Sequence, residues 1–137
     1  MTPLVAFHEL SYYTLSHKTE EFIHQYIIDA FAAQTADEKT KPVKINFGLI
    51  GLYLHLEKGY SGKQVQLAHM QLTKYKKFLP VIVLPKNRGD ITVLEVLKEP
   101  EGLARDEKIE EWMLEVWQAY ASEHKKIADF LQKYLLK

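Results

Sequence analysis

The six histidines of this chain are the residues best suited to chemistry. Imidazole binds transition metals and transfers protons near neutral pH. His24 and His124 interrupt otherwise apolar helical patterns, and both patterns must face the same core. We therefore expect His24 to be mostly buried, and His124 to lie within reach of His24 or of Gln34. The remaining candidates for binding a ligand or metal are Asp29, His8, His17 and His69.

A divalent transition metal (zinc, nickel or iron) held by histidines is one interpretation of this set. The chain has no cysteine, so the ligands would be imidazoles and carboxylates. No HxxxH pair occurs, and His17 and His24, seven residues apart, share a face only if one helix contains both. The more frequent alternative is a set of core histidines, each hydrogen-bonded to a carboxylate, an amide or a tyrosine.

Asp29 is the carboxylate to consider together with His24. Five residues apart on a helix, the two side chains point roughly 140° from each other, so a dyad would need His124 or His69 to approach from another helix. We expect Asp29 to lie nearer a wet edge than His24. It could act as a general base or orient another group, but a structural hydrogen bond or an interhelical salt bridge is the more common role.

Two glycines, Gly48 and Gly51, lie within one turn of a helix predicted over 43–58. Glycine inside a helix costs about 1 kcal/mol relative to alanine, so the pair indicates that another backbone passes close by. With Lys44 and His55 they form one stripe along the helix. We interpret the stripe as a packing or interface face, within the chain or in a homodimer, and a ligand resting on it is the alternative.

The elements that must position these residues are predicted to be helical. The segment 20–34 is apolar nearly all the way round at about 100° per residue, which is typical of a helix buried among others. Capping signals occur at Thr2, Thr19, Gly59, Ser61 and Thr92. We predict an all-α bundle of five or six helices, near 3–16, 20–35, 43–58, 62–78 and 105–135, with a short helix over 92–98.

The segment from Pro80 to Gly89 is the one place where we predict no helix. Two prolines bracket a β-branched run, and Asn87-Arg88-Gly89 is a turn signal. A lone extended strand would have no partner here, so we predict an apolar connector that covers the core. The C-terminal pattern predicts one long helix, in which Ser122 is the place where a break would fall.

Composition limits the class of protein. The 137 residues suit a single domain, 1–137, with 47% hydrophobic and 26% charged residues. The 18 basic residues balance 18 acidic ones, so no overall field attracts nucleic acid, and we expect none as a partner. The sequence has neither a signal-peptide pattern nor an apolar run of about 18 residues. We therefore expect a cytoplasmic protein without a membrane segment.

Four motifs occur in one order that resembles an uncharacterised bacterial family of domains of unknown function. His24-xxxx-Asp29-Ala30-Phe31-Ala32-x-Gln34 resembles the family's HxxxxDAYAxQ signature. The segments 51–59, 91–96 and 112–124 are similar to its GLxxxLExG, TVxxV and WxxxVWxA…H motifs. Many relatives carry N-terminal cysteines, and some have a histidine where this chain has Thr35, so a cysteine-assisted metal site is not available here. The resemblance implies that the chain belongs to this family, and the family has no established activity that could be transferred to it.

Two classes of function are compatible with these residues. The absence of a GK[ST] phosphate loop and of a GxSxG elbow weighs against common enzymes. We predict a non-enzymatic helical binding or interaction module, with a homodimer and a small-molecule ligand as the partners to test. The alternative is a metal- or histidine-dependent, hydrolase-like enzyme whose pocket is lined by His24, His124, Asp29 and tyrosines.

Overall fold

The computed structural model describes residues 1–17 and 21–136, and every regular element among them is helical. The α-helices are α1 (Pro3–Ser16), α2 (His24–Thr35), α3 (Pro42–Lys58), α4 (Gly62–Leu72), α5 (Val93–Lys98), α6 (Leu103–Ala119) and α7 (His124–Tyr134). Two short 3₁₀ segments, η1 (Thr73–Phe78) and η2 (Ala121–Glu123), follow α4 and α6. The predicted all-α class is confirmed, with seven α-helices where five or six were expected.

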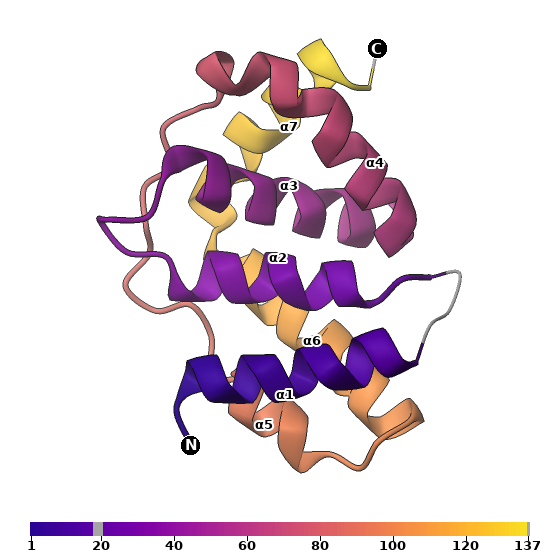
Figure 1. Ribbon diagram of the computed structural model, residues 1–137. Coiled ribbons are helices and arrows are strands. Elements are labelled where there is room, and N and C mark those ends of the chain that lie inside the picture. The colour runs from indigo at the N-terminus through magenta and orange to yellow at the C-terminus, as the bar shows by residue number, and fades with distance from the viewer. Residues whose placement is uncertain (18–20, 137) are drawn as a thin grey trace.

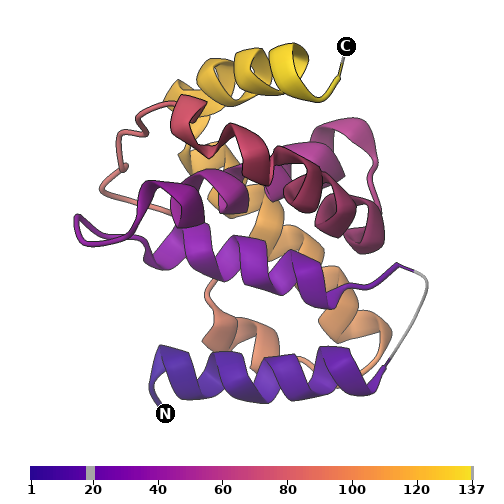
Figure 2. The same cartoon turned by 45° about the horizontal axis from the view of Figure 1, so that its top comes forward.

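Helix α2 lies at the centre of the fold. It lies between α1 and α3 in both views, and α6 crosses behind this layer (Figure 1; Figure 2). It contacts α1, α3, α4 and α6. On one side α3 also packs against α4 and α7, and on the other α1 packs against α5. The helix whose sequence is apolar nearly all the way round therefore packs against four other helices, as its pattern predicts.

The core contains large amphipathic rings whose polar atoms are all paired. Trp112 and Tyr120 are wholly buried. The Trp112 indole N–H donates to Gln34 Oε1 at 2.9 Å, and the Tyr120 hydroxyl donates to the Ala33 carbonyl at 2.6 Å. Both partners belong to α2, so these bonds fix α6 against the central helix. A ring buried with its polar atom satisfied keeps the full benefit of apolar burial.

Several helix ends form where the local sequence predicts them. Thr2 Oγ1 accepts from the Val5 amide at 3.2 Å to cap α1. At the start of α4, Ser61 and Gln64 form the predicted reciprocal capping box. Gly59 ends α3 with a left-handed φ of 72°, a conformation that costs glycine little. These signals involve neighbours within four residues, which is why the sequence alone identifies them.

The start of α2 differs from the prediction. The helix begins at His24, whereas the sequence predicts a start at residue 20 with Thr19 as its cap; Thr19 lies outside the described residues. Phe22 has a positive φ of 54°, and the Glu21 carbonyl accepts from the Gly62 amide at 2.6 Å. The chain before α2 is thus bonded to the start of α4, which prevents it from continuing the helix.

The C-terminal part does not form the single helix predicted over 105–135. Helix α6 ends at Ala119, and α7 begins at His124 after the 3₁₀ turn η2. The break falls at the place marked by Ser122 in the sequence. Its cause is long-range: the Glu123 carboxylate in this turn accepts from the Val83 amide at 2.7 Å. A continuous helix would give up that bond.

The helix predicted over 62–78 is also shorter. Helix α4 ends at Leu72, and η1 continues as a 3₁₀ segment whose backbone is non-helical at Tyr75, with φ −108° and ψ 17°. The Tyr75 ring lies 4.6 Å from that of Tyr134 in α7, so the kink allows a contact between segments far apart in the sequence.

The predicted connector contains neither helix nor strand from Leu79 to Asp90. Side chains hold its backbone in place of a neighbouring strand. The Pro80 carbonyl accepts from Asn46 Nδ2 at 3.0 Å, and the Val81 carbonyl accepts from Lys126 Nζ at 2.9 Å. The prediction of a non-helical segment here is confirmed.

Candidate functional site

Asp29 is a buried carboxyl group in the middle of α2. Only 2% of its surface is exposed. Its Oδ1 accepts from the Gln25 side-chain amide at 3.1 Å, whereas its Oδ2 has no hydrogen-bond partner among the described residues. The expectation that Asp29 lies nearer a wet edge than His24 is therefore wrong, because α3 covers this side of α2.

Two glycines of α3 make room for this carboxyl group. A Cβ atom at Gly51 would lie 1.8 Å from Asp29 Oδ2, and one at Gly48 would lie 3.0 Å from the Asp29 carbonyl oxygen. Any side chain at position 51 would displace Asp29. The prediction that another backbone passes close to these glycines is confirmed, and that backbone is α2 of the same chain. The glycine face is consequently not free to contact a second copy.

The surroundings of Asp29 favour its neutral form. Burial raises the pKa of the carboxyl group well above its usual value, and the hydrogen bond from Gln25 opposes this only in part. An acid without a cationic partner in a low-dielectric site holds its proton. Asp29 is thus a protonated or readily protonated group whose Oδ2 is buried without a partner among the described residues.

Asp29 also lines a groove of about 420 Å³ that is open to solvent along α1, α2 and α3. Each helix contributes large apolar side chains to its wall, and these are Leu4 and Phe7, Ile28 and Phe31, and Val43 and Phe47. The rings of Phe7 and Phe31 are stacked, with centroids 4.4 Å apart and an interplanar angle of 16°. The groove is mainly apolar, with flat aromatic surfaces.

Two basic side chains complete the polar part of the groove. Lys44 of α3 and His69 of α4 both line it, and Lys44 is exposed. His69 Nε2 lies 2.9 Å from the Phe47 carbonyl; because a carbonyl can only accept, Nε2 carries the hydrogen. Burial lowers the pKa of His69 to about 4. His69 is therefore neutral near pH 7, with Nδ1 as a hydrogen-bond acceptor.

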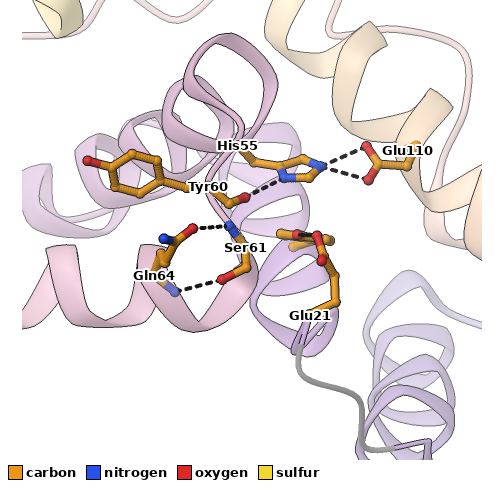
Figure 3. A network of polar contacts seen from close by, with 7 residues as sticks. Glu21, His55, Tyr60, Ser61, Gln64 and Glu110 are labelled. Atoms are coloured by element: carbon orange, nitrogen blue, oxygen red, sulfur yellow. Dashed lines mark hydrogen bonds and ion pairs between the residues drawn. The ribbon is translucent and has the colours of Figure 1, made fainter.

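His55, the last residue of the predicted stripe, belongs to a separate polar cluster. Figure 3 shows its ring between the Tyr60 carbonyl and the Glu110 carboxylate. Nδ1 lies 2.7 Å from the carbonyl oxygen, and Nε2 lies 2.6 Å and 2.9 Å from the two carboxylate oxygens. Both partners are acceptors, so both ring nitrogens carry hydrogen and His55 is an imidazolium.

The charges around His55 agree with this protonation state. Burial alone would lower the pKa of His55, but the hydrogen bonds with Glu110 and Tyr60 raise it on balance. The Tyr26 ring packs against the imidazole, with centroids 4.0 Å apart, and its hydroxyl donates to Glu21. With both nitrogens occupied, His55 offers no lone pair to a metal or a substrate. Its role here is to join α3 to α6.

The prediction for His24 is wrong in one respect, because the side chain is only half-buried. As the first residue of α2 it lies at the helix end, beside α1. Its Nδ1 lies 2.9 Å from Thr14 Oγ1; since Thr14 donates to the Ser11 carbonyl, it accepts from His24. His17 is the C-cap of α1, so it belongs to a different helix and cannot share a helix face with His24.

The structure gives His124 and Gln34 partners of their own. The His124 ring stacks on Trp117 at 3.7 Å, and its Nε2 donates to the Trp117 carbonyl at 2.7 Å. Gln34 donates to the Ile91 carbonyl at 2.7 Å and accepts from Trp112. No hydrogen bond among the described residues joins His24, His124 and Gln34. His8 is exposed on α1.

A metal centre of several side chains is not preformed in the described structure. Within residues 1–17 and 21–136, no three His, Asp or Glu side chains form a group that could hold a metal ion. The polar residues gathered in one place are instead Asp29, Gln25, Lys44 and His69, around the groove. Asp29, Lys44 and His69 are among the residues that the sequence indicates, whereas Gln25 is not, although its position one turn before Asp29 is the signal for a hydrogen-bonded pair.

Most of the groove lies in the part of the chain that a known family covers. A family model described as a family of unknown function (DUF5946) matches residues 5–121. The chain belongs to DUF5946. No curated protein and no solved structure matches the chain. The uncharacterised family expected from the motifs is thereby confirmed, and no relative supplies an activity.

The DUF5946 match contains Asp29, Gly48, Gly51 and His69, and it ends before His124. Apart from Leu4, the residues that line the groove lie within the match, whereas α7 lies beyond it. Within the part of this DUF5946 protein that the structure describes, no helix is both long and apolar enough to cross a membrane.

Proposed function

We propose that this DUF5946 protein is a non-enzymatic module that binds a small, largely apolar molecule in the groove along α1, α2 and α3. The observation that carries the proposal is the unpaired Oδ2 of Asp29. A buried polar atom without a partner costs stability, and an apolar residue of similar size would avoid that cost. A buried ionisable group that lowers stability and lies beside an open groove is typical of a binding site.

The shape of the groove supports the same conclusion. Its volume of about 420 Å³ lies in the range of small-molecule sites, which are mostly apolar with a few well-placed polar groups. Phe7, Phe31 and Phe47 provide flat apolar surfaces, while Asp29 and His69 provide the polar groups. Lys44 adds a cation at the exposed edge.

A fragment screen followed by two-dimensional ¹H–¹⁵N NMR tests the proposal. Ile28 lines the groove and is 36% exposed, so Ile28→Trp should fill the groove without disturbing the core. Leu114 on α6 is 45% exposed and Leu114→Trp is the matched control. We expect fragments to shift groove resonances in the wild type and in Leu114→Trp, but not in Ile28→Trp. Equal binding by both variants, or no fragment that shifts the groove, contradicts the proposal.

A hydrolase-like, histidine-dependent enzyme is the second candidate, because Asp29 and His69 line the same groove from different helices. In that case neutral His69 would act as the base through Nδ1. Hydrolysis of p-nitrophenyl acetate faster than free imidazole achieves, and its loss in His69→Gln, would support this candidate. A rate equal to that of free imidazole would exclude His69 as a catalytic base for this ester.

A homodimer and a cytoplasmic location remain proposals, and a metal held by histidines remains the alternative interpretation of the histidine set. A homodimer is tested by light scattering of the purified protein. Zinc, nickel or iron bound through histidine is tested by elemental analysis of the freshly purified protein. A cytoplasmic location is tested by fractionation of cells that express the protein.

A further inference from the structure

The polar groups of the inner groove can act as hydrogen-bond acceptors when Asp29 is ionised. The amide of Gln25 already donates to Asp29 Oδ1, which leaves Oδ2 to be satisfied. His69 uses its hydrogen on the Phe47 carbonyl, which leaves Nδ1 as an acceptor. Asp29 is the carboxyl group of the lining, and Lys44 is its cation at the exposed edge. In its neutral form the Asp29 carboxyl group offers one O–H, whereas a charged donor in the groove would hold it as a carboxylate with two acceptor oxygens.

We propose that the ligand is a primary amine on an apolar, ring-containing body, with its ammonium group donating to the Asp29 carboxylate. This inference rests on the proposed function, since it names the chemical class of the ligand in that groove. Oδ2 lies against Gly51 in the structure, so the proposal includes a rotation of the carboxyl group toward the groove when the amine binds. The stacked Phe7 and Phe31 rings would contact the apolar body.

An amine fits the groove better than an acid does. A ligand carboxylate beside Asp29 would bring two acidic groups together in an apolar site, which disfavours the charge on both. An ammonium group instead ionises Asp29, whose proton passes to solvent, and forms a charge-assisted hydrogen bond. The other titratable side chains that line the groove are Lys44, which is exposed and screened by water, and His69, which is neutral near pH 7.

Three probes with closely matched bodies test the assignment: 2-phenylethylamine, 2-phenylethanol and 3-phenylpropanoate, each titrated into the full chain by NMR. We expect the amine to bind about tenfold more tightly than the alcohol, as one charge-assisted hydrogen bond allows. Asp29→Asn should reduce the amine to the affinity of the alcohol. Asp129→Asn, which removes an exposed acid on α7, is the matched control and should leave the preference unchanged.

A second measurement does not depend on a variant. Saturating amine should move the ¹³Cγ resonance of Asp29 toward its ionised position, whereas the alcohol should not. Equal affinities for amine and alcohol, tighter binding of the propanoate, or an unmoved ¹³Cγ resonance would each overturn the assignment. If none of the three probes binds while the fragment screen succeeds, the amine is wrong and the binding module stands. If the screen fails as well, the proposed function fails.

Discussion

The carboxyl group of Asp29 occupies the space that a side chain at Gly51 would need. Oδ2 of Asp29 would lie 1.8 Å from a Cβ atom at position 51, so the two residues depend on each other. Glycine lets α2 and α3 approach closely, and the close approach covers the acid. The chain thereby places an ionisable group at the centre of its fold instead of on the surface.

Gly51→Ala should destabilise the protein by about 1–3 kcal/mol, the usual cost of an overpacked core. The double variant Asp29→Ala/Gly51→Ala should recover part of this loss, because removing the carboxyl group frees the space. Urea unfolding of the wild type, both single variants and the double variant measures the coupling. Strictly additive effects would show that the two side-chain positions do not compete for space.

Asp29→Asn should stabilise the protein at neutral pH. The pKa of Asp29 is raised in the folded state, so its contribution to stability falls as pH rises above the unfolded value of about 3.9. We expect the variant to gain about 1–3 kcal/mol at pH 7 and less near pH 4. The exposed control Asp129→Asn should stay within about 0.5 kcal/mol of the wild type. A less stable Asp29→Asn at pH 7 would contradict the assigned burial cost.

Glu110→Gln should destabilise the protein in a manner that depends on pH. The pKa of His55 is raised on folding, so its ion pair contributes fully below the unfolded pKa of about 6.5. The contribution disappears as pH rises through the higher folded pKa. Since the Glu110 side chain is 47% exposed, we expect about 1 kcal/mol at pH 6 and almost nothing at pH 9.

The neighbouring variant Glu111→Gln is the control for this cluster. Its carboxylate pairs with Lys108 at 3.2 Å and is 60% exposed, so its effect on stability should be small and constant between pH 6 and 9. Denaturation curves at several pH values, with an NMR titration of His55, make the comparison. If both variants show the same pH profile, the His55–Glu110 pair does not account for the dependence.

Gln34→Leu should cost about 1–3 kcal/mol, because it leaves the Trp112 N–H and the Ile91 carbonyl without partners. Thr35→Ala, at the exposed next position, should change stability by less than about 0.5 kcal/mol. Hydrogen exchange of the Trp112 indole provides a local measurement and should become faster only in Gln34→Leu. An unchanged exchange rate would mean that Gln34 does not protect that group.

Local signals explain which parts of the fold could be predicted. Thr2, Ser61 and Gly59 act on backbone groups within a few residues, and the close approach at Gly51 follows from the cost of glycine in a helix. The break between α6 and α7 depends on Glu123 meeting Val83, forty residues away. The periodicity of a single sequence does not reveal a contact between residues so far apart. It therefore predicts one helix through residue 123, and this prediction is wrong.

The candidate site was predicted only in part, for the same reason. Residue type alone indicates Asp29, Lys44 and His69, but the helical pattern wrongly predicts that Asp29 lies nearer a wet edge than His24. The angle between Asp29 and His24 around the helix follows from their spacing in the sequence. The burial of each side chain depends instead on which other helix covers that face of α2. His55 and Glu110 are 55 residues apart, and the sequence pattern around neither residue indicates that the two side chains form a pair.

The link between Glu123 and the connector has a consequence for how DUF5946 proteins can diverge. The family match ends at residue 121, two positions before the carboxylate that accepts from Val83. A relative whose chain differs after that point loses the acceptor for an amide inside the shared region. Such a lineage must replace the acceptor or alter its own equivalent of the connector. Because the donor is the backbone amide at position 83, which every residue except proline has, the side chain at 83 can vary freely while position 123 has to supply the acceptor.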